Sequence, residues 1–416
     1  MSTQEAQSIL LTHSHPQQSF RLLELSPELE QLLSSKDAPA EQFPHLFVGS
    51  TNTTSFELKS PSAALAQAVA DPSAPEYVNL CTQTQTYRIL QVQSSNSIHM
   101  LQPSLGHISR ADIKVVEEEA GETGALNLPD KAMTTIAKCA STLGLHTPSG
   151  GFSAIPFLEK SLRLYDRRSD DDDADDGDVA MGDTSCGGQM GLLEVQRLRE
   201  GVCADIPVST AQCEDGWTEL CAFVHREQDE VACCRPSART RLNVWKRMVE
   251  GAILQGIDLE KQFLVGDLWK SVLDDDDTSA LPFPRNLLEA VVRRLCALDQ
   301  RPPLADEMKW ASFDKLDCTR WVGETYLAAT APTPSSAIGR NEFLRAWKDC
   351  LPESWRGEAA LSKLTDGAYK SPDPTAIHFV EASQRQQTSK AASAGSTTAS
   401  NAKVTRNWHE LLKSRR

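Results

Sequence analysis

The sequence predicts an α+β protein, in which a strand-rich N-terminal part is followed by small helical modules with short hairpins. Three observations predict this class. Short runs that alternate apolar and polar residues, separated by turn formers, fill residues 20–101. From residue 190 onward apolar residues recur at spacings of three and four, which is typical of amphipathic helices. Near the C-terminus the order is helix, turn, helix, hairpin. The chain has 416 residues, a length that predicts roughly two to four domains.

Composition indicates a protein with ordinary cores. Apolar residues make up 40% and charged residues 24% of the chain. No run approaches the ~18 apolar residues of a membrane helix, and the first residues lack the basic and apolar regions of a signal peptide. We therefore expect neither membrane insertion nor secretion.

The charge is unevenly distributed. There are 42 Lys and Arg against 57 Asp and Glu, a formal net charge of −15. Seven carboxylates lie within residues 170–178 and four more at 274–277, whereas residues 386–416 carry a net charge of +5. The global charge argues against non-specific coating of DNA but leaves local basic contacts open.

Eleven cysteines raise the question of zinc or disulfides. Five of them fall within residues 203–234, but none forms the C-x-x-C pair that tetrahedral zinc usually uses, and Cys233 and Cys234 would point apart in a strand. We expect reduced thiols that fill the core, and neither a metal nor a cofactor.

The N-terminal part is expected to be an incomplete sheet. Residues 1–19 are polar and aperiodic, which predicts a disordered start. A turn of helix is expected from Pro27 through Leu33, and strands at residues 20–25, 56–58, 77–81, 86–93 and 97–101. So few strands cannot close on themselves. Residues 20–165 are thus predicted to form a partial antiparallel β-barrel that partner subunits complete, and the acidic residues 166–189 a disordered linker.

Residues 190–298 are predicted to be helical. Helices are expected over residues 192–202, 242–253 and 287–295, the last after Pro284, and Asp317 is expected to cap another. Ser209 and Gln212 have the spacing of a capping box that opens a short helix, and a strand is expected at residues 222–224.

Residues 299–383 give the clearest module. Phe343, Trp347 and Leu351 form a helical stripe that ends at Pro352. A second helix is expected over residues 358–364, with Gly367 as its stop, and then a two-stranded wing at 369 and 377–380. This is the order of a winged helix, and a weaker copy at 190–224 predicts two or three such modules in tandem.

The basic tail, residues 384–416, is rich in Ser, Ala and Thr, which predicts disorder. Trp408, Leu411 and Leu412 form a small amphipathic patch within it. A docked helix and a partner-binding tail both remain open for this patch.

Motifs of catalysis are missing from the sequence. It contains no P-loop, no G-x-G-x-x-G after a strand, no nucleophile elbow and no H-E-x-x-H, so we expect a protein that is not an enzyme. Basic side chains near the predicted second helices could neutralise phosphates, although each one alone is equally consistent with a solvated face. The candidates for sequence-independent DNA contact are Lys246, Arg247, Arg293, Arg294, Arg340, Arg345 and Lys348, together with Arg239, Arg241 and Arg356.

Several short motifs resemble one known family. A Phe- and Leu-rich strand begins at Phe20 and Leu22, and is followed by the pairs Leu80-Cys81, Thr86-Tyr87 and Ser95-Asn96. This pattern, with Gln85 in place of a lysine, resembles the "defective in sister chromatid cohesion protein 1" family. The segments around Phe343 and Ile377 are similar to the last winged helix of that family.

The resemblance implies a non-catalytic nuclear subunit of an alternative replication factor C, the chromosome-transmission-fidelity clamp loader. It implies that the N-terminal strands pair with the large ATPase subunit and a small third subunit. It also implies that the winged helices engage the catalytic subunit of DNA polymerase epsilon and DNA, and so act indirectly on the sliding clamp PCNA. The barrel residues implied are Phe20, Leu22, Leu80, Cys81, Thr86, Tyr87, Ser95 and Asn96. The alternative is a stand-alone winged-helix transcription regulator that binds promoters.

Overall fold

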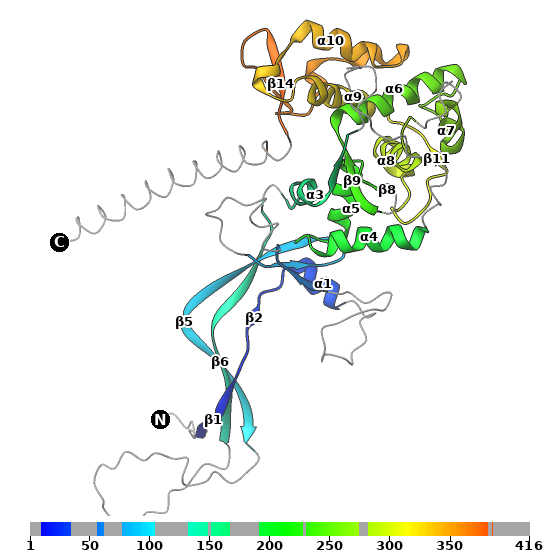
Figure 1. Cartoon of the computed structure of the whole chain (residues 1–416). Helices are drawn as coiled ribbons and strands as arrows, with labels where there is room; N and C mark the ends of the chain where they lie inside the picture. Colours follow the sequence, from blue (N-terminus) through cyan, green and yellow to red (C-terminus); the bar gives the residue numbers. More distant parts are fainter. Residues whose placement is uncertain are drawn as a thin grey trace, which may run out of the picture. The chain divides into compact units, whose positions relative to one another are not determined.

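The computed structural model describes residues 10–34, 56–61, 77–104, 132–148, 151–166, 191–227, 230–273, 282–381 and 385 (Figure 1). The chain forms two compact units, each described here by itself. Unit 1 comprises residues 1–57, 77–80 and 86–148, and unit 2 comprises residues 58–76, 81–85 and 149–416.

A six-stranded sheet forms most of unit 1. The strand order is β1-β6-β5-β4-β3, and β2 pairs with β6 as well. The strands are β1 Leu10–Ser19, β2 Leu22–Leu23, β3 Glu57–Lys59, β4 Asn79–Cys81, β5 Thr86–Ser104 and β6 Ala132–His146.

The long pair of β5 and β6 differs from the short strands that we predicted. Residues 86–93 and 97–101 belong to one 19-residue strand, which pairs antiparallel with β6 from Arg88 opposite His146 to Ser104 opposite Ala132. A shift of register between Gln93 and Ile98 carries the strand through a polar stretch that resembles a turn in the sequence.

The sheet is also not purely antiparallel. β1 and β2 pair with β6 in parallel, and β1 occupies residues 10–19, where a disordered start was predicted. Pairing with β6 orders this polar segment, and β6 itself was not predicted. The described strands do not close into a barrel.

The core of unit 1 is small. Leu29 from helix α1 (Pro27–Ser34), Leu80 and Tyr87 are its fully buried members, with Phe56 and Leu145 packed against them. The predicted helix after Pro27 is therefore confirmed, and its apolar side chain Leu29 anchors it to the sheet.

Unit 2 contains three repeats of a similar order of elements, which is complete in the first: helix, strand, two helices and two strands. In the first repeat these are α3 Ile155–Ser161, β7 Arg163–Tyr165, α4 Leu192–Ala204, α5 Thr210–Glu219, β8 Phe223–Glu227 and β9 Glu230–Pro236. In the second they are α6 Ala238–Leu254, β10 Phe263–Leu264, α7 Val265–Leu273, α8 Arg285–Leu295 and β11 Trp310–Ala311, with a 3₁₀ turn, η2, at Leu298–Gln300. In the third they are α9 Lys315–Thr330, η3 Pro334–Ser336, β12 Ile338–Gly339, α10 Arg340–Asp349, η4 Glu353–Glu358, η5 Leu361–Lys363, β13 Tyr369–Lys370 and β14 Ala376–Phe379.

The strand order repeats as well. In the first and third repeats the last strand lies between the other two, in the orders β7-β9-β8 and β12-β14-β13. In the second repeat β10 pairs with β11, and a single bridge from Cys296 to Phe313 takes the place of the remaining strand. The three repeats are thus similar but not identical: β7 pairs with β9 in parallel, whereas β12 pairs with β14 antiparallel, and the second repeat has one strand fewer.

Most predicted elements of unit 2 are confirmed. The helices expected near residues 192–202, 242–253 and 287–295 are α4, α6 and α8, and the two strands expected at 369 and 377–380 form the antiparallel pair of β13 and β14. Ser209 and Gln212 form the predicted capping box, in which the Ser209 side chain accepts from the Gln212 amide.

Two local predictions are wrong. The cap of α9 is Asp314, whose carboxylate accepts a hydrogen bond from the Asp317 amide at 2.7 Å. Residues 358–364 do not form an α-helix; the 3₁₀ turns η4 and η5 stand there. The cause lies in the core, since Trp355 is buried, stacks on Trp245 and donates its indole N–H to Glu260, which holds the segment in tight turns.

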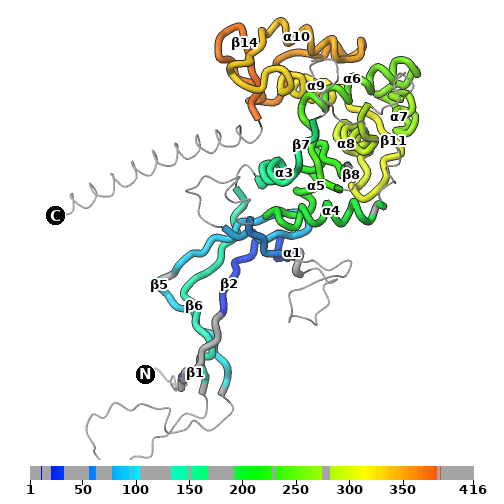
Figure 2. Tube along the Cα trace, in the orientation of Figure 1, coloured from blue at the N-terminus to red at the C-terminus, as the bar shows by residue number. Residues whose placement is uncertain are grey.

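The two units divide before α3 and not at the acidic run, and α3 and β7 lie beside α5 and β8 (Figure 2). α3 and β7 precede the run, yet Phe157 and Leu158 pack in one core with Ile206 and Trp217, and β7 pairs with β9. Both ends of the run therefore belong to the first repeat. The described residues exclude most of the acidic run at 166–189, residues 274–277 and nearly all of the basic tail at 384–416. The boundary expected at residue 298 falls within the second repeat.

The core of unit 2 is extensive. One buried cluster runs through the second and third repeats and includes Trp245, Leu288, Trp347 and Ile377. Gly323 on α9 permits close packing, because a Cβ there would lie 2.5 Å from the Trp347 indole. Cys203 and Cys213 are joined in a disulfide between α4 and α5, where reduced thiols were expected; their Cα atoms lie 6.0 Å apart.

Candidate interaction surfaces

Apolar side chains of β5 in unit 1 are exposed in two pairs, one on each side of its register shift, and the two pairs together are called the β5 row here. Leu90, Val92, Ile98 and Met100 are 47%, 59%, 47% and 45% exposed, in two alternating pairs. On the edge of β5 opposite β6 the neighbouring described strand is β4, which is three residues long against the 19 residues of β5. An edge strand with exposed apolar side chains is a surface on which another strand can pair.

The residues implied by the family motifs lie mostly elsewhere. Leu80, Cys81, Thr86 and Tyr87 are buried, and Tyr87 and Leu80 form the small core of unit 1. They stabilise the sheet and cannot meet a partner directly. Phe20 and Leu22 are half-buried, and only Ser95 and Asn96 are exposed. The exposed row of β5 was missed, although the alternation at residues 89–93 was its signal.

Arg293 holds a loop of unit 2. Its guanidinium donates to the carbonyl oxygens of Pro302 at 2.8 Å, Pro303 at 3.0 Å and Asp306 at 2.7 Å. Burial lowers its pKa. Because its donors are used within the fold, Arg293 does not serve as a free phosphate contact.

Arg294 joins the three repeats. Its guanidinium lies 2.7 Å from a carboxylate oxygen of Glu219 on α5 and 3.0 Å from one of Asp317 on α9, while Arg294 itself stands on α8. Burial acts to lower the pKa of Arg294, but the two carboxylates outweigh it and the pKa is raised. The side chain is 13% exposed, so the structure makes it an internal clamp instead of the predicted DNA contact.

Among the predicted cations that are exposed, several lie on α6 and α10. Lys246 on α6, and Arg345 and Lys348 on α10, are exposed, and none takes part in an ion pair among the described residues. The two helices meet, since the Trp245 indole N–H donates to the Cys350 carbonyl at 2.8 Å. Burial raises the pKa of the Cys350 thiol, and the nearby charge of Lys246 opposes that rise. Lys246 therefore lies beside the end of α10.

The other basic candidates are partly engaged. Arg340 is half-buried and donates to the Ser371 hydroxyl at 2.8 Å, and Arg356 donates to the Leu351 carbonyl at 3.4 Å. Arg247 and Arg241 are half-buried, whereas Arg239 is exposed. The structure thus brings together a smaller basic set than the sequence predicted.

Neither a metal site nor a membrane helix is found within the described ranges. No three or more His, Cys, Asp or Glu side chains there are arranged to hold a metal ion. None of the helices in those ranges combines the length and apolar character that a membrane crossing requires.

Extended surfaces, not enclosed sites, are therefore the main features: an open strand edge with apolar side chains, and a repeated helix–strand unit with a small basic face. Such features define an α+β protein of the protein-interaction class. The model of the family "Sister chromatid cohesion protein Dcc1" matches residues 20–391, and the chain belongs to this family. Membership implies a role in sister chromatid cohesion. No match was found among curated proteins.

Proposed function

We propose that this protein is a non-catalytic adaptor subunit of the alternative replication factor C clamp loader. Its unit 1 binds the large ATPase subunit and the small third subunit, and its unit 2 binds DNA polymerase epsilon and DNA. In this role it acts in the nucleus and affects the loading or unloading of PCNA during replication, which supports cohesion. ATP hydrolysis belongs to the other subunits.

The exposed row of β5 is the observation that carries this proposal. Four large apolar side chains along one open strand would be costly in a protein that works alone, at about 25 cal/mol for each Å² left in water. Strands from partner subunits could pair with the open edge and cover the row. A barrel shared between subunits would then form where the described strands leave the sheet open.

The DNA contact is proposed for unit 2. We infer that its three repeats act as winged-helix modules, and Lys246 on α6 and Arg345 and Lys348 on α10 offer exposed charges for the contact. Contacts of this kind are to phosphates, so the affinity should be independent of sequence and should fall with salt. A transcription regulator would instead discriminate between sequences.

Co-expression of the full chain with the two loader subunits tests the adaptor role. The double variant Val92→Lys/Met100→Lys should no longer co-elute with them on size exclusion, because charged side chains cannot be buried against partner strands. The control is Leu193→Lys on α4, which is also exposed and should leave the complex intact. Normal co-elution of the double variant would refute the proposal that β5 is the binding edge.

DNA binding is tested by fluorescence anisotropy with full-length protein. Arg345→Glu/Lys348→Glu should weaken binding to all duplex sequences alike and reduce the slope of log K against log salt by about 2. Lys363→Glu, on the exposed turn η5, serves as the control. Unequal losses among sequences would instead favour the transcription regulator.

A further inference from the structure

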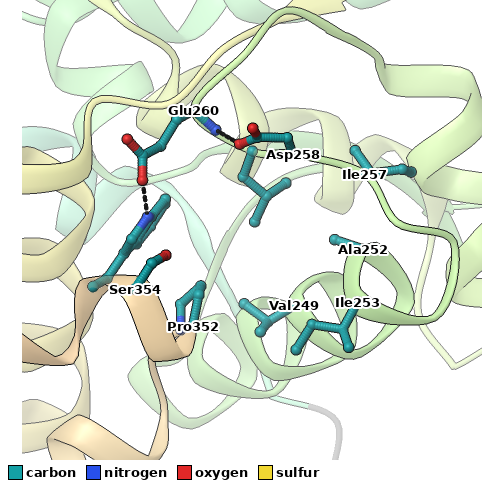
Figure 3. A pocket seen from close by; sticks show the side chains of 10 residues that line it. Val249, Ala252, Ile253, Ile257, Asp258, Glu260, Pro352 and Ser354 are labelled. Carbon is teal, nitrogen blue, oxygen red and sulfur yellow. Dashed lines mark hydrogen bonds between the residues drawn. The ribbon is translucent and has the colours of Figure 1, made fainter.

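A groove in unit 2 lies between the end of α6, the loop that follows it, and η4 (Figure 3). Its volume is about 210 Å³. This is below the roughly 300–1,000 Å³ of small-molecule pockets, so the groove fits one large side chain of a peptide better than a cofactor.

The walls of the groove are apolar and its charged lining is acidic. Val249, Ile253 and Ile257 come from α6 and the loop, and Pro352 and Trp355 from the opposite side. The charged residues of the lining are Asp258 and Glu260. Lys261 pairs with Asp258 at 2.9 Å, whereas the neighbouring carboxylates Glu250 and Glu353 are exposed.

The floor of the groove is fixed, but one wall is open to water. The Trp355 indole donates to Glu260 and stacks on Trp245, which joins the floor to the core. Ile253 is 67% exposed, so this wall offers apolar surface to an occupant. An occupant that suits these walls is apolar with flanking positive charge.

The end of this chain has that chemistry. Trp408, Leu411 and Leu412 have the spacing of one helical face, and Arg406, Lys413, Arg415 and Arg416 surround them. The family match ends at residue 391, so this segment is an addition to the family pattern. We propose that residues 406–413 bind in the groove of their own chain, with Trp408 inserted between Ile253 and Trp355 and the basic residues beside Glu250, Glu260 and Glu353.

The length of the connection allows this contact. Trp408 follows Glu381, which is among the last described residues, by 27 positions. A flexible segment of that length spans roughly 30 Å on average and at most about 90 Å when extended. A tether of this kind gives an effective concentration of roughly 1 mM, so a weak site with a Kd of about 0.1 mM would be about 90% occupied.

Hydrogen–deuterium exchange of the full-length protein tests the proposal. The tail amides should exchange about tenfold more slowly than in Ile253→Lys, which places a positive charge in the groove. Leu254→Lys is the matched control: Leu254 is 66% exposed and adjacent in sequence, but does not line the groove. In Trp408→Ala the peptide that covers residues 253–261 should exchange faster, whereas His409→Ala should leave it unchanged.

Three results would overturn the proposal. The first is a tail that exchanges at the free rate in the wild-type protein. The second is equal loss of protection in Ile253→Lys and Leu254→Lys, which would show non-specific apolar contact. The third is protection that falls on dilution, which would assign the groove to the tail of a second copy.

Discussion

The two units of this chain bury their apolar side chains to very different extents. In unit 2 a continuous core includes most large apolar residues of the second and third repeats, among them Trp245 and Trp347. In unit 1 the fully buried core is Leu29, Leu80 and Tyr87, while β5 turns apolar side chains to water. Unit 2 therefore has the core of a self-sufficient fold, whereas the exposed apolar side chains of unit 1 support the proposal that a partner covers them.

The largest effect is expected for Trp245→Ala. Trp245 is fully buried and packs against Phe313, Trp321 and Trp355, so its removal should lower the free energy of unfolding of unit 2 by about 3–5 kcal/mol. Denaturant unfolding followed by circular dichroism measures it. Trp310→Ala is the control, since Trp310 is half exposed and should change stability by about 0.5 kcal/mol or less. Equal losses of unfolding free energy in Trp245→Ala and Trp310→Ala would contradict a tightly packed core in unit 2.

Arg294→Ala should cost slightly less, about 3 kcal/mol, because it leaves Glu219 and Asp317 without their shared cation. The loss should also separate the unfolding of the first repeat from that of the others, which fluorescence and circular dichroism would report as non-coincident transitions. Arg285→Ala on the same helix removes only a surface pair with Glu289 and should cost roughly 0.5 kcal/mol or less. A single unchanged transition in Arg294→Ala would show that the clamp does not couple the repeats.

Ser209→Ala should lower the stability of unit 2 by about 1 kcal/mol, because the first amides of α5 lose their side-chain acceptor. Gln212→Ala should cost less, since Ser209 still caps the helix in that variant. Thermal unfolding of both variants measures the order of the two losses. The reverse order would mean that the Gln212 side chain does more than complete the capping box.

The smallest change in stability is expected for substitutions of exposed apolar residues on β5. Val92→Lys or Ile98→Lys should change the stability of the free protein by about 0.5 kcal/mol or less, because both side chains already face water. Leu29→Ala, in the small core of unit 1, should cost about 2–5 kcal/mol in the same unfolding experiment. If Val92→Lys costs as much as Leu29→Ala, the row on β5 is covered in the free protein and the contrast between the units is wrong.

Secondary-structure elements were predictable from the sequence where neighbouring residues decide them, and were not where pairing with a distant segment decides them. The stripes of α6 and α8 and the capping box at Ser209 were predictable, because residues three and four apart decide them. β6 was not predicted, since its small and polar residues become a strand only by pairing with β5. Its buried residues Thr135, Ala137 and Cys139 include a polar and a small side chain, so the sequence of β6 shows no clear alternation of apolar and polar residues.

The candidate sites show the same limit. The sequence does not show whether an arginine is buried. The internal contacts of Arg293 and Arg294 therefore could not be distinguished from the exposure of Arg345 and Lys348 before the structure was known. Motif residues such as Tyr87 form the core of the sheet, whereas the candidate interaction surface consists of other residues on β5, which belong to no motif. The turns η4 and η5 likewise depend on Trp355, whose contacts with Trp245 and Glu260 span about a hundred positions or more of chain.

The pairing of β7 with β9 joins the parts of the chain that precede and follow the acidic run. Because the acidic run starts and ends within the first repeat, a protease that cleaves there would nick the protein without dividing it. The two pieces should travel together on a native column and separate only in denaturant. Insertions or deletions in the run should likewise leave the order and spacing of the repeats unchanged, so this segment can vary in length without disturbing the fold of unit 2.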